Sequence, residues 1–139
     1  MTTATAADLR QKIRGMWPEV ALLWLPDGQY ALPPLESVLD ILNKTDVAFI
    51  PRTGGGVWDC DDYALAANYM IKRKGLELAV EYPWAFGECF GTKFKGREMD
   101  HSVNILVADD GQIWLMYAEG GWQHWRAERN EDTVHTVKM

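Results

Sequence analysis

The segment from Asp59 to Lys74 constrains the fold most, because its apolar residues recur at the spacing of an α-helix. One face carries the cysteine and the apolar side chains of the segment, which are Cys60, Tyr63, Ala64, Ala67, Met70 and Ile71. Asp59 is a favourable N-cap residue, and Gly75 is typical of the position after a last helical turn. We therefore predict a helix over 59–74 whose apolar face packs against the rest of the protein.

Strands are predicted after this helix and two more helices before it. Alternating apolar and polar residues indicate strands at 78–90, 101–108, 113–119 and 133–137. Asp109-Asp110-Gly111 has the composition of a tight hairpin turn between the second and third strands. Helical spacing is found at 5–17 and 35–42, with a short extended pair at 20–25 and 29–32 between these helices. This order predicts an α+β fold in which N-terminal helices precede a central helix packed on an antiparallel β-sheet.

Length and composition fit one globular domain over residues 1–139. Hydrophobic residues make up 47% of the chain and include seven Trp, which is enough apolar material for a core. The net charge of -6, without a basic block, disfavours a nucleic-acid partner. Residues 1–7 lack the features of a signal peptide, and no apolar run reaches the roughly 20 residues of a membrane span. We therefore expect no membrane contact and a cytoplasmic or virus-associated protein.

Cys60, His101 and Glu119 are the residues whose positions suggest chemistry. A cysteine is a nucleophile as thiolate, which the free N–H groups of a first helical turn and a nearby imidazolium both favour. His101 opens a strand and shares one face with Val103 and Ile105, and if this face meets the helix that starts at Cys60, the imidazole can reach the sulfur. The hairpin turn brings Glu119 level with His101, where a carboxylate would orient the ring. The pattern predicts Cys60 as nucleophile, His101 as base and Glu119 as orienting acid.

Other residues around this group have weaker assignments. The backbone N–H of Cys60 is the natural first oxyanion donor, and the Trp58 indole and the Tyr30 hydroxyl are candidates for the second. Trp122, like Trp125, lies beside Gly120-Gly121 and would flank a cleft and contact substrate. Each residue also has a purely structural explanation. An isolated cysteine, for example, is more often a small buried apolar residue.

No metal or other cofactor is expected. The carboxylates of Asp59, Asp61 and Asp62 are ligands of the kind that calcium prefers, but their spacing does not match an EF-hand loop. A calcium ion therefore stays as an alternative. The two Cys and three His lack zinc-finger spacing.

Two segments resemble the papain-like and transglutaminase-like cysteine proteases. Gly56-Val57-Trp58-Asp59-Cys60-Asp61-Asp62-Tyr63-Ala64 resembles their nucleophile segment. His101-Ser102-Val103-Asn104-Ile105, followed by Asp110-Gly111, Trp114 and Glu119, resembles their histidine strand, turn and acidic strand. The C-terminal protease domain of a mushroom agglutinin and small phage-encoded domains are similar. The resemblance implies a papain-like fold and a Cys60, His101, Glu119 triad acting on a peptide or protein substrate.

Two departures from that family are visible. Gly120-Gly121 follows the acid where relatives commonly carry Pro and Gln, and no glutamine stands shortly before Cys60. The first departure affects the substrate loop, and the second leaves the oxyanion hole unassigned.

The expected function is a cysteine peptidase or amidase that forms a thioester acyl-enzyme. A cell-wall peptidase or a transglutaminase of the same clan would form the same intermediate. A non-catalytic binding or virion-associated module that retains the papain-like fold is the alternative from another class. The acidic residues around Cys60 and the Gly-Gly pair after Glu119 favour that alternative.

Overall fold

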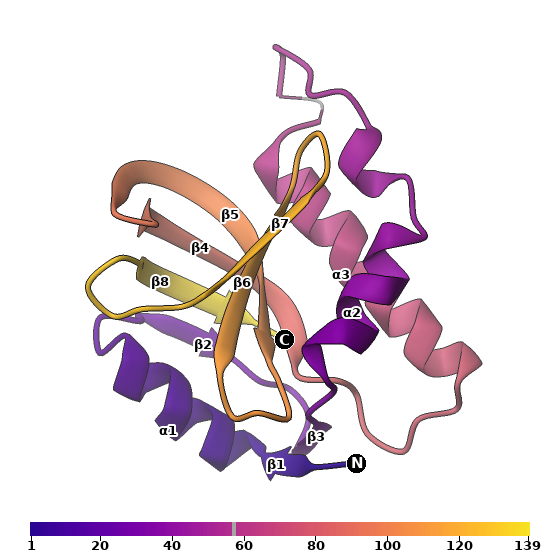
Figure 1. The fold of residues 1–139 in the computed structure, drawn as a ribbon. Helices are drawn as coiled ribbons and strands as arrows, with labels where there is room; N and C mark the ends of the chain where they lie inside the picture. Colours follow the sequence, from indigo (N-terminus) through magenta and orange to yellow (C-terminus); the bar gives the residue numbers. More distant parts are fainter. Residues whose placement is uncertain (57) are drawn as a thin grey trace.

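The computed structural model describes residues 1–56 and 58–139, so Val57, part of the predicted nucleophile segment, lies outside the described residues. The elements are coloured along the chain in Figure 1. In chain order they are β1 (Thr3–Thr5), α1 (Ala6–Met16), β2 (Leu22–Trp24), β3 (Gln29–Ala31), α2 (Leu35–Asn43), the 3-10 helix η1 (Val47–Phe49), α3 (Cys60–Glu77), β4 (Phe86–Phe94), β5 (Arg97–Val107), β6 (Ile113–Ala118), β7 (Trp122–Arg126) and β8 (Thr133–Lys138).

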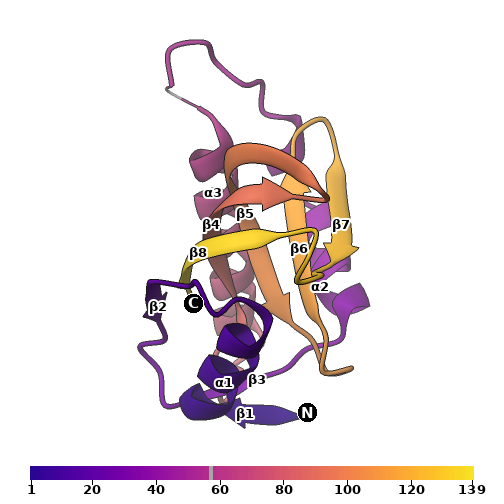
Figure 2. The ribbon, with the colours of Figure 1, turned by 90° about the vertical axis from the view of Figure 1, so that its left-hand side faces the viewer.

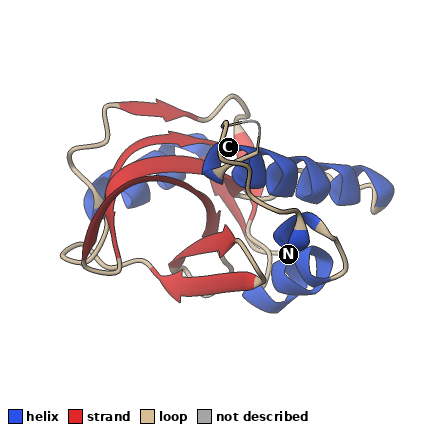
Figure 3. Cartoon of the chain, turned by 90° about the horizontal axis from the view of Figure 1, so that it is seen from above, coloured by secondary structure: helices blue, strands red, loops and turns tan. Residues whose placement is uncertain are grey.

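A six-stranded sheet with the order β2-β8-β4-β5-β6-β7 forms the centre of the molecule. β2 pairs parallel to β8, and the other neighbours in this sheet are antiparallel. β1 and β3 form a separate two-stranded sheet next to α1 (Figure 1). Seen from above, the strands curve strongly, and α3 runs along the outside of the curved layer (Figure 3). β2 and β7 are therefore the two edges of the large sheet.

The two faces of the large sheet pack on different helices, because side chains alternate along a strand. On one face Val103, Ile105 and Leu115 belong to the same buried cluster as Leu9 and Ile13 of α1. On the other face, side chains of β5 and β6 pack with α2 and α3, and this cluster includes Leu106, Met116, Val38, Leu42, Ala67 and Ile71. Figure 2 shows α1 on one side of the strands and α2 and α3 on the other.

Asn104 joins α3 to the sheet on this second face. Its Nδ2 donates to the carbonyl oxygens of Ala64, at 2.9 Å, and Gly87, at 3.0 Å. The condition that the face of Val103 and Ile105 meets the Cys60 helix is therefore not met, since this face packs with α1. The reason is that both faces of β5 are buried, so alternation alone cannot say which face meets α3.

The central helix is confirmed with a different end. α3 begins at Cys60, and the backbone N–H of its N-cap residue Asp59 donates to Asp62 Oδ2 at 3.0 Å. Gly75 lies inside the helix, which continues to Glu77. The chain turns instead at Ala79, whose φ of 50° is in the left-handed region.

The predicted α+β, papain-like fold class is wrong. The described residues form eight strands in two sheets and only three α-helices, which is a β-rich fold. The prediction missed β1 and β7, and β7 is one edge of the large sheet. β7 is the five-residue sequence Trp-Gln-His-Trp-Arg, which lacks the alternation of apolar and polar residues that indicates a strand. Among the described residues, no helix is both long and apolar enough to cross a bilayer.

Candidate functional site

The start of α3 lies near the place where β5 and β6 separate. The β5–β6 register runs from Val107↔Ile113 to Asn104↔Met116, which leaves His101 and Tyr117 beyond the last pair. Tyr63 in the first turn of α3 meets Tyr117 edge-on, with ring centroids 6.2 Å apart. The start of α3 and the end of β6 thus lie close together at one end of the molecule, near the top of Figure 1.

His101 is buried at this junction, with 6% of its surface exposed. Its ring lies edge-on to that of Tyr117, with centroids 4.2 Å apart, and its centroid is 6.0 Å from that of Phe94. Burial lowers the pKa of His101, the positive charge of Arg52 lowers it further, and Glu119 opposes both. The neutral ring is therefore favoured.

Glu119 is bound by partners other than His101. The Tyr117 hydroxyl donates to Glu119 Oε2, and an Arg52 guanidinium nitrogen lies 3.6 Å from the same oxygen. Burial raises the pKa of Tyr117, and the hydrogen bond to Glu119 raises it further. Sequence reasoning missed Arg52 and Tyr117, because nothing in their local sequence indicates contacts with distant residues.

Cys60 lies close enough to Tyr117 for its charge to affect the pKa of that hydroxyl. Its Sγ and carboxylate oxygens of Asp59 and Asp61 all lie within 4.8 Å of one another. A hydrogen bond with Asp61 raises the pKa of Asp59, and burial raises it further. The structure thus gathers Cys60, His101 and Glu119 at one end of the molecule, but no hydrogen bond among the described residues joins any two of them.

The other predicted site residues have structural contacts. Tyr30 is fully buried in the α1 core at the opposite end of the molecule, where its hydroxyl accepts from the N–H of Asp27 at 3.1 Å. The Trp122 indole donates to the carbonyl of Leu42 at 3.1 Å and so ties β7 to the end of α2. Trp58 packs edge-on against Tyr63, and its Nε1 is buried with no hydrogen-bond partner among the residues that the structure describes. The structure therefore does not bring Tyr30 to the group around His101.

A cavity of about 480 Å³ opens beside His101, and we call it the aromatic cavity. Its lining combines aromatic rings with polar and charged side chains from β4 to β7, namely Phe94, Lys95, Arg97, Met99, His101, Tyr117, Gln123 and Trp125. Its volume is within the range of about 300–1,000 Å³ that is typical of small-molecule sites. The centroids of Phe94 and Trp125 are 6.4 Å apart, so a chain of edge-on ring contacts runs from Trp125 through Phe94 and His101 to Tyr117.

Asp132 holds one side of this cavity in place. Its carboxylate is 1% exposed, and Oδ1 accepts from Trp125 Nε1 at 3.1 Å and from the N–H of Lys95 at 3.0 Å. Oδ2 accepts from the N–H of Glu128 at 2.9 Å. One buried carboxylate thus fixes the Trp125 ring and the turn between β4 and β5.

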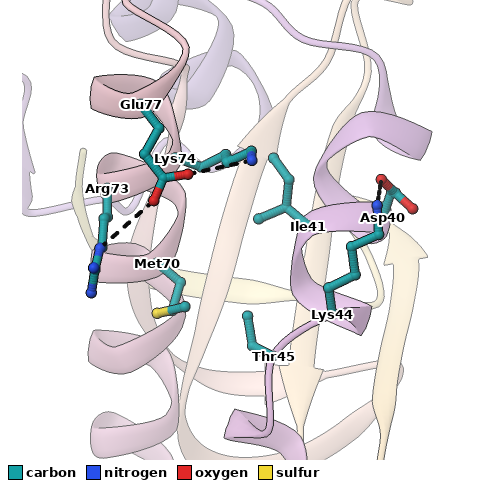
Figure 4. Close-up of a pocket in the computed structure, with 8 residues that line it drawn as sticks. All are labelled: Asp40, Ile41, Lys44, Thr45, Met70, Arg73, Lys74 and Glu77. Carbon is teal, nitrogen blue, oxygen red and sulfur yellow. Dashed lines mark hydrogen bonds and ion pairs between the residues drawn. The ribbon is translucent and has the colours of Figure 1, made fainter.

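A second cavity, between α2 and α3, differs in size and charge (Figure 4). Its volume is about 230 Å³, which is below the usual range for small-molecule sites. Its charged side chains pair with one another: Lys44 lies 2.8 Å from Asp40, and Arg73 and Lys74 lie 3.8 and 3.4 Å from Glu77. These pairs leave few charged groups to hold a ligand, so the aromatic cavity is the better candidate site.

Solved structures share this fold. One, described as a PSL1a–E64 complex, matches with a TM-score of 0.79 and 17% sequence identity over 99% of this chain and 51% of its own length. Another is the Polyporus squamosus lectin bound to the human-type influenza-binding epitope Neu5Acα2-6Galβ1-4GlcNAc, with a TM-score of 0.77 and 17% identity over 99% and 49% of the two chains. The chain spans about half the length of these solved chains. No protein-family model and no curated protein matches it.

These comparisons correct the expected identity and activity. The assignment to the papain-like and transglutaminase-like cysteine proteases is corrected by these structures, because the chain shares its fold with part of a lectin. The same finding corrects the expected activity of a cysteine peptidase or amidase. It also corrects the description of the protein as a thiol hydrolase with a catalytic triad. A peptide or protein substrate has no support. What the comparisons establish is the fold, which this chain shares with about half of a lectin chain.

Proposed function

We propose that this chain is a non-catalytic carbohydrate-binding module whose ligand occupies the aromatic cavity. A module of the binding class is the alternative that the sequence left open, and a lectin of which about half shares this fold was solved with a bound glycan. The observation that carries the proposal is the row of rings at His101, Phe94, Tyr117 and Trp125, bordered by hydrogen-bonding side chains.

The lining has the two kinds of surface that a sugar needs. The C–H face of a pyranose packs on an aromatic ring, and the hydroxyl groups need donors and acceptors around that ring. Trp125 is only partly buried, and so its ring can contact a ligand, while Gln123 and Arg97 are exposed at the border. In this proposal His101 contributes its neutral ring to the floor of the cavity.

The cavity is organised before a ligand arrives, which limits the entropy lost on binding. Asp132 fixes the Trp125 indole, and Glu119 fixes the Tyr117 hydroxyl at the other end of the row of rings. Cys60 is not among the residues that line the cavity. The proposal therefore assigns Glu119 a role in positioning Tyr117 and gives the Cys60 thiol no part in binding.

Isothermal titration calorimetry with Trp125→Ala tests the proposal. The ligands are the sialylated trisaccharide of the lectin complex and its neutral part Galβ1-4GlcNAc, preceded by a glycan array that includes both. We expect Trp125→Ala to weaken binding by about thirtyfold or more, since loss of a central aromatic contact costs about 2 kcal/mol or more. Cys60→Ala should bind like the unmodified protein.

Trp24→Ala is the matched control. Trp24 is an exposed tryptophan and, like the partly buried Trp125, has a lysine above its ring: Lys138 Nζ lies 5.1 Å from the Trp24 centroid, and Lys95 Nζ lies 5.0 Å from that of Trp125. It belongs to β2, at the opposite edge of the sheet from β7. The proposal fails if the array shows no glycan binding, if Trp125→Ala and Trp24→Ala have equal effects, or if Cys60→Ala abolishes binding.

A further inference from the structure

We infer that a second ligand site lies at the C-terminal end of α3 and binds the alkyl chain and the carboxylate of a fatty acid. The site is a cavity of about 440 Å³ at the end of α3 opposite Cys60 (Figure 1), and we call it the aliphatic cavity. Its wall includes Ile71, Leu76, Val80, Pro83, Trp84 and Phe86, together with Lys72. It shares no residue with the aromatic cavity, so the inference is independent of the proposed carbohydrate-binding function.

The walls of the aliphatic cavity are held in place without a ligand. The Val80 N–H donates to the Gly75 carbonyl at 3.1 Å, and a Cβ at Gly75 would lie only 3.3 Å from Val80 Cγ2. Further along the chain, the Ala31 N–H donates to the Pro83 carbonyl and the Ala85 N–H donates to the Ala31 carbonyl, both at 2.9 Å. The segment that follows α3 is therefore fixed to the helix and to β3, which limits the entropy lost on binding.

The lining of this cavity suits an aliphatic chain and not a sugar. Apart from Lys72 and the Trp84 indole, the described residues that line it have apolar side chains or, at Gly75, no side chain. Sugar hydroxyls would lose water there and find few hydrogen-bond partners, whereas methylene groups gain free energy by burial. Leu76 lines the cavity and is 82% exposed, so a bound chain would cover apolar surface that faces water.

The two polar side chains of the lining are donors that lack a partner. Trp84 is 8% exposed, and its Nε1 is buried with no hydrogen-bond partner in the described part of the chain. Lys72 takes part in no ion pair between residues 1–56 and 58–139. A buried donor without an acceptor is costly, so the ligand has to supply an oxygen. A carboxylate can accept from both donors and also carries the charge opposite to that of Lys72.

Lys72 is placed to hold such a carboxylate next to the apolar wall. It lies four residues before Leu76, and so both side chains are on the same face of α3. Glu77 and Glu81 are the acids nearest in sequence, and neither lines the cavity. Glu77 lies 3.8 Å from Arg73 and 3.4 Å from Lys74, on another face of the helix. The acids of this region therefore leave the Lys72 ammonium available to a ligand.

Titrations of the full chain with four matched ligands, followed by isothermal titration calorimetry, test the inference. Octanoate has both the chain and the acid, octanol has the chain without the charge, hexanoate has a shorter chain, and acetate has the acid alone. We expect octanoate to bind about tenfold more tightly than octanol, as for one charge-assisted contact. It should bind about fifteenfold more tightly than hexanoate, because each buried methylene group contributes a factor of about four. Acetate should show no binding.

Two exposed side chains separate the contributions of charge and chain. Lys72→Gln should lower the octanoate-to-octanol ratio about threefold, and Arg14→Gln, which removes an exposed arginine of α1, should not change it. Leu76→Ala should weaken octanoate and octanol by the same factor. Leu65→Ala is its control, because Leu65 is an exposed leucine of α3 that does not line the cavity.

The indole signals of the 15N-labelled protein locate the bound acid. Octanoate should shift the Trp84 Nε1–H signal and leave that of Trp125 in place, because the two rings line different cavities. Equal binding of octanoate and octanol, equal binding of octanoate and hexanoate, or a Trp84 signal that does not move while octanoate binds would overturn the inference. None of these results bears on glycan binding, which has its own test.

Discussion

Asp132→Ala should destabilise the protein more than any substitution of an exposed carboxylate. Its side chain accepts three hydrogen bonds, from Trp125 Nε1 and from the N–H groups of Lys95 and Glu128, and it is 1% exposed. Alanine would remove all three acceptor contacts at once. At about 1 kcal/mol for each hydrogen bond, we expect a loss of about 3 kcal/mol. That is a large part of the roughly 5–15 kcal/mol that stabilises a typical domain.

Urea unfolding followed by tryptophan fluorescence measures this loss. With a slope of about 1.5–2 kcal/mol per molar urea, the midpoint should fall by about 1.5–2 M. Glu19→Ala is the control, because Glu19 is exposed and should change stability by at most about 0.5 kcal/mol. A loss below about 1 kcal/mol for Asp132→Ala would show that water or a rearranged turn replaces the carboxylate, and would refute its role in holding Trp125.

Two further predictions concern packing and pH. Gly87→Ala should cost about 3 kcal/mol in the same unfolding assay, since a Cβ at Gly87 would lie 2.0 Å from the Lys138 carbonyl oxygen. Gly54→Ala is the control and should be nearly neutral, because a Cβ at Gly54 would have nothing within 4 Å. Equal unfolding midpoints for the two variants would contradict the close strand packing. Burial and the charge of Arg52 lower the pKa of His101 below its unfolded value of 6.5. The unfolded state therefore binds a proton more readily than the folded state, and the free energy of unfolding should fall as the pH drops through 6.5. His101→Gln should reduce this fall, measured as unfolding midpoints from about pH 7.5 to 5.5, and an unchanged pH dependence would argue against a buried neutral ring.

The parts of the fold that the sequence predicted are those set by local patterns. Cys60 starts a helix because Asp59 caps it and the apolar residues that follow are spaced for one buried face. The β5–β6 hairpin follows from Asp109-Asp110-Gly111 and the alternation on both sides of the turn. Such features depend on neighbouring residues, which is why they are visible without the fold.

The parts that were missed depend on contacts between distant residues. Which face of β5 meets α3 is decided by Asn104 and its two carbonyl partners, since both faces carry apolar residues. The Asp132–Trp125 bond fixes the aromatic cavity, yet neither residue stands in a motif that would indicate it. The protease assignment relied on short segments around Cys60 and His101, which describe a local arrangement and not the role of the residues gathered there.

The most direct test of the central claim is a titration of the 15N-labelled protein with the sialylated trisaccharide, observed through the tryptophan indole signals. We predict that the Trp125 Nε1–H signal shifts until it saturates, because Trp125 lines the aromatic cavity, and that the Trp24 signal stays in place. The Cys60→Ala variant should give the same titration. A Trp125 signal that does not move while the sugar binds, or a titration that requires the Cys60 thiol, would contradict the account.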